Sequence, residues 1–321
     1  MADGVQVRNG KAFEYAIAYQ YYNYLKNLDL EVVFVDNPAK TVAYNYFQEL
    51  SAKDQQRCLE AAYQTIDTMV KIEPGLTSQK NDKDVLSISL AEDQMGEDGD
   101  VRDVVFSRID PNWEIGFSAK NNNDAVKHSR LSKVLDFGEK WVGVKCSQEY
   151  WDAIKPVFAI LDEAKQKGYL WENIWVDKMT EIYRPILIAF RDELLKIASK
   201  NPEVPAKLVQ YLIGKYPFYK IIKDDSHNLV VVKAFNIEGQ LNKTVNRKKS
   251  QYSTPKIDLP SRIVEFDFLK GSDNTLVMIL DRGWEISFRI HSAEKKVQSS
   301  LKFDIRLLGN PPVLFSQYLF Q

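Results

Sequence analysis

The sequence has few of the residues that form disulfides or bind soft metal ions. Its 321 residues include 2 cysteines, Cys58 and Cys146, and 3 histidines, His128, His227 and His291. Neither residue type forms a cluster with the spacing of a zinc site, so the sequence argues against structural zinc. Sparse cysteine usage is typical of proteins that work in a reducing compartment.

Long apolar runs and a leader pattern are also missing. No uninterrupted apolar run approaches the roughly 18 residues that a membrane-spanning helix needs. The opening residues MADGVQVRNG lack a charged segment followed by an apolar one. We therefore expect a cytoplasmic protein with no membrane partner. Glycine and proline contribute only 14 and 12 residues, and 45% of the chain is hydrophobic, which excludes collagen-like and disordered classes.

An excess of charge of one sign is absent from the chain as a whole, but not from its parts. The formal net charge of −1 divides into −6 for residues 1–145, +1 for residues 146–220 and +4 for residues 221–321. Carboxylates are concentrated between Asp82 and Asp103, whereas residues 241–256 carry cations and no acid. Solvated loops explain both segments, and an acidic pocket beside basic surfaces also suits a metal-dependent enzyme that acts on a polyanion.

Hydrophobic periodicity predicts an α/β (α+β) protein. Helical spacing of apolar residues predicts helices within residues 13–28, 41–70, 123–135 and 147–219. Short runs bounded by turn residues predict strands at 85–90, 101–106, 113–120, 229–235, 263–269, 275–280, 284–289 and 301–307. Because single cores stop growing near about 250–300 residues, more than one region is expected. The pattern gives an α/β core at 1–145, a helical region at 146–220 and a β-rich region at 221–321.

One predicted strand separates apolar from polar side chains. Period-two alternation places Ile115, Phe117 and Ala119 on one face, and the other face carries polar side chains, Glu114, Ser118 and Lys120. Asp103, on the strand before, reaches that polar face if the turn at residues 110–112 pairs the two strands. A carboxylate there can hold a hard cation such as Mg²⁺, and a lysine can activate water or stabilise charge on phosphorus. A surface ion pair between Asp103 and Lys120 is the plain alternative.

This arrangement resembles the PD-(D/E)xK nuclease pattern, in which an Asp on one strand is followed by acid-x-Lys on the next. The chain departs from the pattern at Ser118, which stands where the second acid is expected. Glu14, on the first helix, and Glu114 are the candidates to replace that acid as a metal ligand. Ser118 can instead hydrogen-bond a ligand water. The resemblance implies a mixed sheet with flanking helices and an Mg²⁺-dependent nuclease.

Longer strings are spread along the chain, at Gly10–Glu14, Lys120–Asn123, Ala125–Ser132, Gly283–Ala293 and Ser300–Asp304. Together these strings are similar to the HaeIII family of type II restriction endonucleases. The resemblance implies hydrolysis of double-stranded DNA with Mg²⁺ at a GGCC-type palindrome. It implies catalytic roles for residues of the α/β core, namely Asp103, Lys120, Glu14, Glu114 and Ser118, with Asp103 and either glutamate as metal ligands.

Basic and amide side chains beyond the core are candidates for DNA binding. Lys127, His128 and Arg130 are expected on the helix after the catalytic strand, where phosphates can meet a helix N-terminus. Arginine can bind guanine bidentately, so Arg289 is a candidate base reader, with His291 on the same strand face. The remaining candidates are Asn121, Asn122, Arg247, Lys248 and Lys249. The alternatives are a solvated helix face, a plain solvent loop and, for Arg289, an ion pair with Asp267 or Asp281.

The sequence therefore predicts a restriction endonuclease whose partner is double-stranded DNA. Cutting both strands requires either a homodimer or sequential nicking by one active site. A cognate methyltransferase would act on the same DNA site rather than bind the protein. Two rival interpretations are a structure-specific repair nuclease and a catalytically inactive DNA-binding module.

Overall fold

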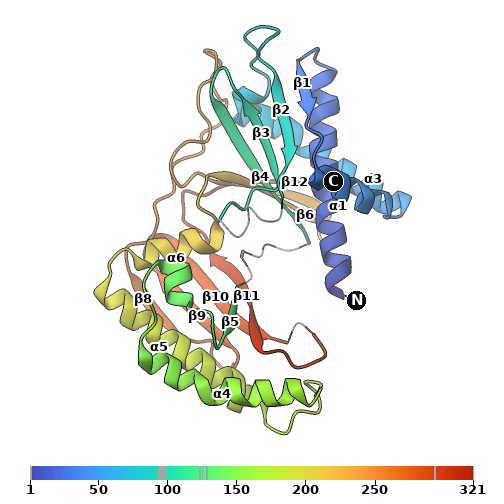
Figure 1. Ribbon diagram of the computed structural model, residues 1–321. Helices are drawn as coiled ribbons and strands as arrows, with labels where there is room; N and C mark the ends of the chain where they lie inside the picture. Colours follow the sequence, from blue (N-terminus) through green and yellow to red (C-terminus); the bar gives the residue numbers. More distant parts are fainter. Residues whose placement is uncertain are drawn as a thin grey trace. The chain divides into compact units, whose positions relative to one another are not determined.

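The computed structural model describes residues 2–92, 99–122, 124, 126–127, 129–292 and 294–320 (Figure 1). The chain forms two compact units. The first comprises Met1–Asp124, Gly214–Ile257 and Val313–Gln321, and the second comprises Ala125–Ile213 and Asp258–Pro312. These units do not coincide with the three consecutive regions expected from the sequence, because the chain leaves the first unit after Asp124 and returns to it twice.

The first unit contains a mixed sheet of 7 strands in the order β1-β2-β3-β4-β6-β7-β12. The strands are β1 (Val32–Phe34), β2 (Leu86–Leu90), β3 (Val104–Arg108), β4 (Trp113–Asn121), β6 (Phe218–Asp224), β7 (Leu229–Phe235) and β12 (Phe315–Phe320). The pairs β1–β2 and β4–β6 are parallel, and the other neighbours are antiparallel. The mixed α/β architecture expected from the sequence is confirmed.

Helices cover one face of this sheet. They are α1 (Ala2–Lys26), α2 (Pro38–Gln48) and α3 (Ala52–Ile72), followed by a short 3₁₀ turn at Pro74–Leu76. Tyr21 of α1 meets Phe106 and Phe117 edge-on, with ring centroids 5.2 and 5.3 Å away. The single helix expected over residues 41–70 is two helices, because Ser51 caps α3 by accepting a hydrogen bond from the backbone N–H of Asp54.

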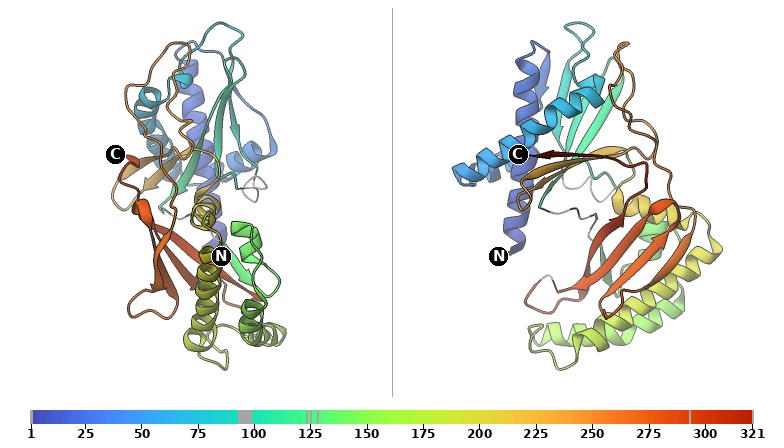
Figure 2. Two further views of the ribbon diagram at one scale, coloured as in Figure 1. Left: turned by 90° about the vertical axis from the view of Figure 1, so that its left-hand side faces the viewer. Right: turned by 180° about the vertical axis from the view of Figure 1, so that it is seen from behind.

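The second unit contains an antiparallel sheet of 5 strands in the order β5-β11-β10-β9-β8. The strands are β5 (Arg130–Ser132), β8 (Ile263–Phe268), β9 (Thr275–Leu280), β10 (Glu285–His291) and β11 (Ser300–Gly309). The helices are α4 (Gln148–Gln166), α5 (Arg184–Lys200) and α6 (Val204–Ile213), with short helical turns at Gly138–Val142, Lys178–Tyr183 and Asp281–Gly283. Phe190 of α5 contacts Phe288 and Phe303 of the sheet, and Figure 2 shows α5 beside these strands.

The helix expected at residues 123–135 is wrong. Arg130–Ser132 form strand β5, in which Leu131 pairs with Leu301 of β11 and is fully buried. Before it, the backbone N–H of Lys127 donates to the carbonyl of Leu212 rather than to a residue of its own turn. Pairing with residues far along the chain therefore overrides the local helical pattern.

None of the helices in the described part of the chain is long and apolar enough to cross a membrane.

Candidate active site

Strand β4 carries the polar residues of the site and part of the core. Ile115, Phe117 and Ala119 are buried in the hydrophobic cluster under the helices, as their alternation predicts. Ser118 and Lys120 alternate with them and belong to the opposite face of the strand. Their position is therefore fixed by a strand whose apolar side chains are locked in the core.

Asp103 lies directly beside this strand. Its backbone N–H donates to the carbonyl of Phe117 at 2.8 Å. Its carboxylate oxygen Oδ2 accepts hydrogen bonds from the Ala119 N–H at 2.7 Å and from the Ser118 hydroxyl at 3.2 Å. Lys120 Nζ lies 3.6 Å from the same oxygen, and the side chains of Lys120 and Asp103 remain 29% and 23% exposed. Hydrogen bonds from strand β4 thus fix the Asp103 carboxylate, and both Asp103 and Lys120 remain accessible to a ligand.

Glu14 of α1 adds a second carboxylate. It is buried and forms an ion pair with Lys11, whose Nζ lies 3.2 Å from Glu14 Oε2. Burial and, after it, the negative charge of Asp103 raise the pKa of Glu14 from 4.5 to about 8, against the opposing effects of Lys11 and Lys120. The structure therefore brings Glu14, Asp103 and Lys120 within electrostatic reach of one another.

Glu114 belongs to a different cluster. Its Oε1 accepts a hydrogen bond from Arg102 Nη1 at 2.6 Å, and Arg102 also binds Asp100 through Nη2 at 2.7 Å. Glu114 precedes Ser118 by four residues, which corresponds to about 13 Å along a strand. Asp100 accepts the Arg102 backbone N–H at 3.1 Å, as a turn residue does. The structure therefore does not bring Glu114 to Asp103.

The donor set at Asp103 and Glu14 suits a hard divalent cation. Among the described residues, no group of three or more His, Cys, Asp and Glu side chains could hold a metal ion by itself. Mg²⁺ is nevertheless bound in many enzymes by one or two carboxylates, with water and substrate phosphate as the other ligands. Two carboxylates and a serine hydroxyl supply only oxygen donors, which fits Mg²⁺ and not a metal that prefers sulfur or imidazole.

The two amide candidates lie at the end of β4 and directly after it. Asn121 is the last residue of β4, and Asn122 has a left-handed backbone with φ of 59°. Asn122 exchanges two hydrogen bonds with Asp225, at 2.8 Å from its side-chain nitrogen and 2.7 Å to its side-chain oxygen. His128 lies outside the described residues. These contacts indicate a structural role for Asn122 at this turn.

Several candidates in the second unit lie on one face of its sheet. Arg130 of β5 pairs with Lys302 of β11, which pairs with His291 of β10, so three cationic or titratable side chains form a cross-strand row. Arg289 is two residues from His291 on the same face and is exposed. Burial lowers the pKa of His291. Lys127 belongs to the same unit but contacts the ring of Tyr211, with Nζ 4.4 Å from the ring centroid.

Asp267 and Asp281, the acids considered as partners of Arg289, bind other residues. Asp267 binds Arg191 at 2.8 Å. Asp281 accepts hydrogen bonds from the backbone N–H and the hydroxyl of Ser261, at 2.8 and 2.7 Å. In the register of the sheet, Arg289 lies opposite Thr275 of β9 and Asp304 of β11.

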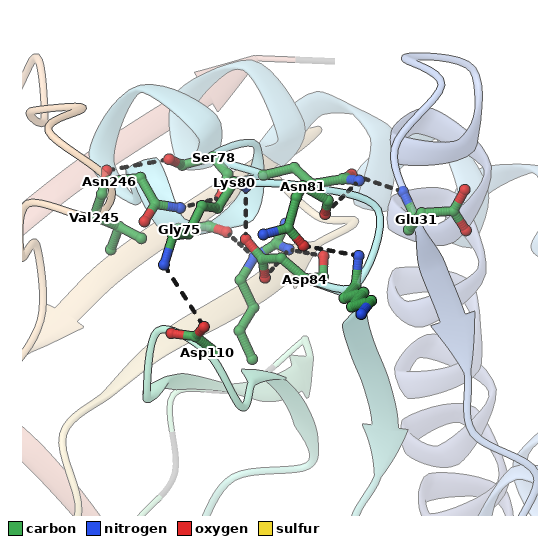
Figure 3. A network of polar contacts seen from close by, with 12 residues as sticks. Glu31, Gly75, Ser78, Lys80, Asn81, Asp84, Asp110, Val245 and Asn246 are labelled. Carbon is green, nitrogen blue, oxygen red and sulfur yellow. Dashed lines mark hydrogen bonds and ion pairs between the residues drawn. The ribbon is translucent and has the colours of Figure 1, made fainter.

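The turn that carries Arg247, Lys248 and Lys249 in the first unit is held by hydrogen bonds to residues 77 and 78. Ser78 donates to the carbonyl of Val245 at 3.1 Å, and the Asn246 side chain donates to the carbonyl of Ser78 at 3.0 Å (Figure 3). Lys248 Nζ donates to the Thr77 hydroxyl at 2.6 Å. Arg247, Lys248 and Lys249 are exposed on this ordered turn. The prediction that they contact DNA therefore concerns a fixed surface loop.

Sequence reasoning missed three charged residues beside the site. Lys220 of β6, Lys233 of β7 and Asp124 form a cluster in which both lysines are buried. The signal was present, since each lysine interrupts an apolar strand, in Phe218–Ile222 and in Val230–Phe235. A lysine inside such a run is seldom buried unless it has a partner.

Comparisons with known proteins place this chain among DNA-cleaving enzymes. A sequence model of the family described as HaeIII restriction endonuclease matches residues 10–311. The chain is 37% identical over 310 residues to the type II restriction enzyme HaeIII of Haemophilus aegyptius, and the match covers 95% of each protein. No solved structure matches. The match extends over nearly the whole sequence, so the chain belongs to the HaeIII restriction endonuclease family.

Proposed function

We propose that the chain cleaves double-stranded DNA at a short palindrome, GGCC, in an Mg²⁺-dependent reaction. The observation that carries this proposal is the convergence of Asp103, Glu14 and Lys120 in a member of a restriction endonuclease family. The family supports site-specific DNA cleavage. The oxygen-donor set supports the metal, and the resemblance supports the base sequence.

Asp103 and Glu14 would hold the cation. Bound Mg²⁺ supplies Lewis-acid chemistry, because it withdraws charge from a phosphate that is being attacked. Burial is the main cause of the raised pKa of Glu14, and the negative charge of Asp103 adds to it. A divalent cation held by these two carboxylates would favour their ionised forms.

The remaining residues of the site would orient the carboxylate and the phosphate. The Ala119 N–H and the Ser118 hydroxyl both donate to Oδ2 of Asp103, which fixes the plane of the carboxylate. Lys120 Nζ, beside that oxygen, can donate hydrogen bonds to a phosphate oxygen and stabilise negative charge that develops during attack. Ser118 is thus a positioning residue, and Lys120 a catalytic one.

We assign base recognition to the face of the five-stranded sheet in the second unit that carries Arg130, Arg289 and His291. Arg289 is placed to read guanine, and Arg130 and His291 to contact phosphate or base edges. Each well-made bidentate contact contributes about 1–3 kcal/mol of discrimination, so a four-base-pair site needs several. A homodimer or two successive nicks would complete the double-strand break. A companion methyltransferase would protect the same site in host DNA.

Defined duplexes test this proposal. A 30-base-pair duplex with one central GGCC is incubated with the protein in Mg²⁺, beside a duplex with that site scrambled and a third with it methylated. We expect cleavage of the first duplex alone, and none in EDTA. Cleavage of a branched junction in preference to all linear duplexes would contradict the proposal and favour a structure-specific nuclease. Binding of GGCC without cleavage would indicate an inactive DNA-binding module.

A further inference from the structure

Two residues of strand β11 lie on the face of the second sheet that carries Arg289. In the antiparallel register of β10 and β11, Arg289 lies opposite Asp304, and Arg306 follows Asp304 by two residues on the same face. The intervening face of β11 belongs to the core, where Phe303 contacts Phe190 of α5. Asp304 and Arg306 therefore point away from α5, beside Arg289.

The carboxylate of Asp304 binds one side of the Arg306 guanidinium. Arg306 Nε lies 3.4 Å from Asp304 Oδ1, and Arg306 Nη2 lies 3.1 Å from Asp304 Oδ2. Nε and Nη2 form one side of the planar guanidinium, whereas Nη1 and Nη2 form its outer end, which is a second fork of N–H donors. A side-on pair of this kind fixes the plane of the guanidinium and is compatible with a bidentate partner at the outer end.

The two members of this pair differ in exposure. The side chain of Asp304 is 15% exposed, and that of Arg306 is 63% exposed. The acid is thus set into the face of the sheet, and the arginine extends from it into solvent. An ion pair with so exposed a member contributes little to the stability of a fold. The arrangement therefore suits an arginine that binds a ligand better than one that supports the fold.

Arg191 of the same unit shows the structural alternative. Its Nε lies 2.9 Å from Asp192 Oδ1, and its Nη1 lies 2.8 Å from Asp267 Oδ1. The Arg191 side chain is 23% exposed. Two carboxylates thus share this guanidinium and hold it against the fold, whereas Asp304 engages one side of Arg306.

We propose that Arg306 reads a guanine of the DNA site and that Asp304 is a positioning residue, which holds the guanidinium in the orientation for reading. The proposal rests on the proposed function and adds to it a second guanine reader beside Arg289. Guanine presents two acceptors, N7 and O6, in the major groove, and the fork of one arginine binds both at once.

The spacing of the two arginines suits a site with adjacent guanines. GGCC carries two neighbouring guanines on each strand. Arg289 and Arg306 are diagonal neighbours across β10 and β11, and side chains in such positions are about 7–8 Å apart, within reach of one another when they are long. Two long arginine side chains can therefore converge on consecutive base pairs.

Base analogues test the contact with guanine. Each of the two guanines is replaced in turn, in both strands, by 7-deazaguanine, which lacks the N7 acceptor, and affinity is measured in EDTA. The wild type should bind each substituted duplex about tenfold more weakly. Arg306→Gln should bind unsubstituted GGCC about tenfold more weakly, and one of the two substitutions should then have no further effect. Undiminished effects of both substitutions in Arg306→Gln would overturn the proposal.

Arg184→Gln is the matched control for this experiment. Arg184 is a partly exposed arginine of the same unit that binds an aspartate, with Nη1 2.7 Å from Asp273 Oδ1. The control variant also loses one positive charge and one ion pair. It should show the wild-type response to both guanine substitutions.

Arg306→Lys separates base reading from a phosphate contact. The variant keeps the positive charge and loses the planar fork. We expect it to bind a duplex with a scrambled site as the wild type does, and to lose about tenfold of its preference for GGCC. Wild-type preference in Arg306→Lys would show that only the charge matters, and would overturn the assignment of Arg306 as a base reader.

Asp304→Ala tests the positioning role with a result that damage to the fold cannot produce. The variant removes a negative charge from the DNA-binding face, so it should bind the scrambled duplex more tightly than the wild type. Its preference for GGCC should fall several-fold, because Arg306 is no longer held. The double variant with Arg306→Gln should have the preference of Arg306→Gln alone, since the two residues act as a unit. Wild-type preference in Asp304→Ala would overturn the positioning role.

The preference of the wild type distinguishes the two levels of inference. If the wild type binds and cuts GGCC no better than the scrambled duplex, the proposed function and the role of Arg306 fall together. If the wild type prefers GGCC and Arg306→Gln matches Arg184→Gln on every duplex, only the assignment of Arg306 is wrong.

Discussion

The hydroxyl of Ser118 donates to Oδ2 of Asp103 across 3.2 Å. Ser118 stands two residues before Lys120, at the position where the PD-(D/E)xK pattern carries its second acid. In the proposed site that position supports Asp103 as a metal ligand, and Glu14 on helix α1 would supply the second carboxylate. Under this proposal the acid and the lysine of the acid-x-Lys motif come from two elements, helix α1 and strand β4.

Ser118→Ala is expected to slow cleavage without abolishing it. The variant removes one of the two hydrogen bonds that fix Asp103, and a hydrogen bond to a charged group contributes about 1.5–3 kcal/mol. The cleavage rate on the GGCC duplex should fall by about 10–100-fold, with DNA affinity unchanged. Ser118→Thr, which keeps the hydroxyl, is the matched control. A fully active alanine variant would show that this hydrogen bond is irrelevant to the reaction.

Glu14→Gln and Glu114→Gln distinguish the two glutamates that were candidates for the second ligand. The charge of Asp103 acts on Glu14, whereas Glu114 is bound to Arg102. Glu14→Gln should raise the Mg²⁺ concentration needed for half-maximal cleavage by about tenfold or more, the usual order for perturbing a metal site. Glu114→Gln should leave that concentration unchanged. The reverse pattern in the Mg²⁺ titration would assign the ligand to Glu114.

Arginines on the second sheet should divide into base readers and phosphate contacts. Arg289→Gln is expected to lose about 1–3 kcal/mol of preference for GGCC over a site with one base changed. Arg130→Gln should weaken binding to all duplexes alike and reduce the salt slope. Arg191→Gln, which breaks an ion pair with Asp267 in the same unit, is the control. Competition binding against single-substitution duplexes measures both effects. Equal preference in Arg289→Gln and wild type would remove Arg289 from recognition.

The stability of the fold should depend on pH through Glu73. This residue is fully buried and accepts hydrogen bonds from the Tyr219 hydroxyl and the Asn242 N–H, each at 2.6 Å. Burial raises its pKa from 4.5 to about 7. A carboxyl with a raised folded-state pKa binds its proton more tightly when folded. Its stabilising contribution is therefore complete below pH 4.5 and is lost as pH rises through about 7.

Urea unfolding of the wild type and Glu73→Gln at pH 5 and pH 8 measures this effect. The wild type should lose stability relative to Glu73→Gln between these pH values, by up to about 3 kcal/mol if the whole shift is realised. Parallel changes with pH in the two proteins would mean that Glu73 does not titrate in this range.

Local sequence patterns were sufficient for the parts of the fold that depend on neighbouring residues. The alternation in β4 placed Ile115, Phe117 and Ala119 in the core and Ser118 and Lys120 on the opposite face, as the structure has them. Asp103 was correctly placed beside Lys120, because a short turn forces β3 and β4 to pair.

Features that depend on distant pairing could not be predicted locally. Leu131 became part of a strand only because Leu301 lies beside it. The cluster of Asp124, Lys220 and Lys233 requires β4 to pair with β6 in parallel, and residues 125–213 of the second unit lie between those strands in the sequence. The contribution of Glu14 likewise depends on how α1 packs on the sheet, which periodicity alone does not give.

Digestion of a plasmid of known sequence by the wild type, Asp103→Asn and Lys120→Met tests the central claim most directly. In Mg²⁺ the wild type should yield discrete fragments whose sequenced ends all fall at GGCC. Both variants should leave the plasmid uncut, or cut it at least about 100-fold more slowly, while still binding the GGCC duplex. Wild-type fragments with ends at unrelated sequences, or undiminished cutting by either variant, would contradict the account.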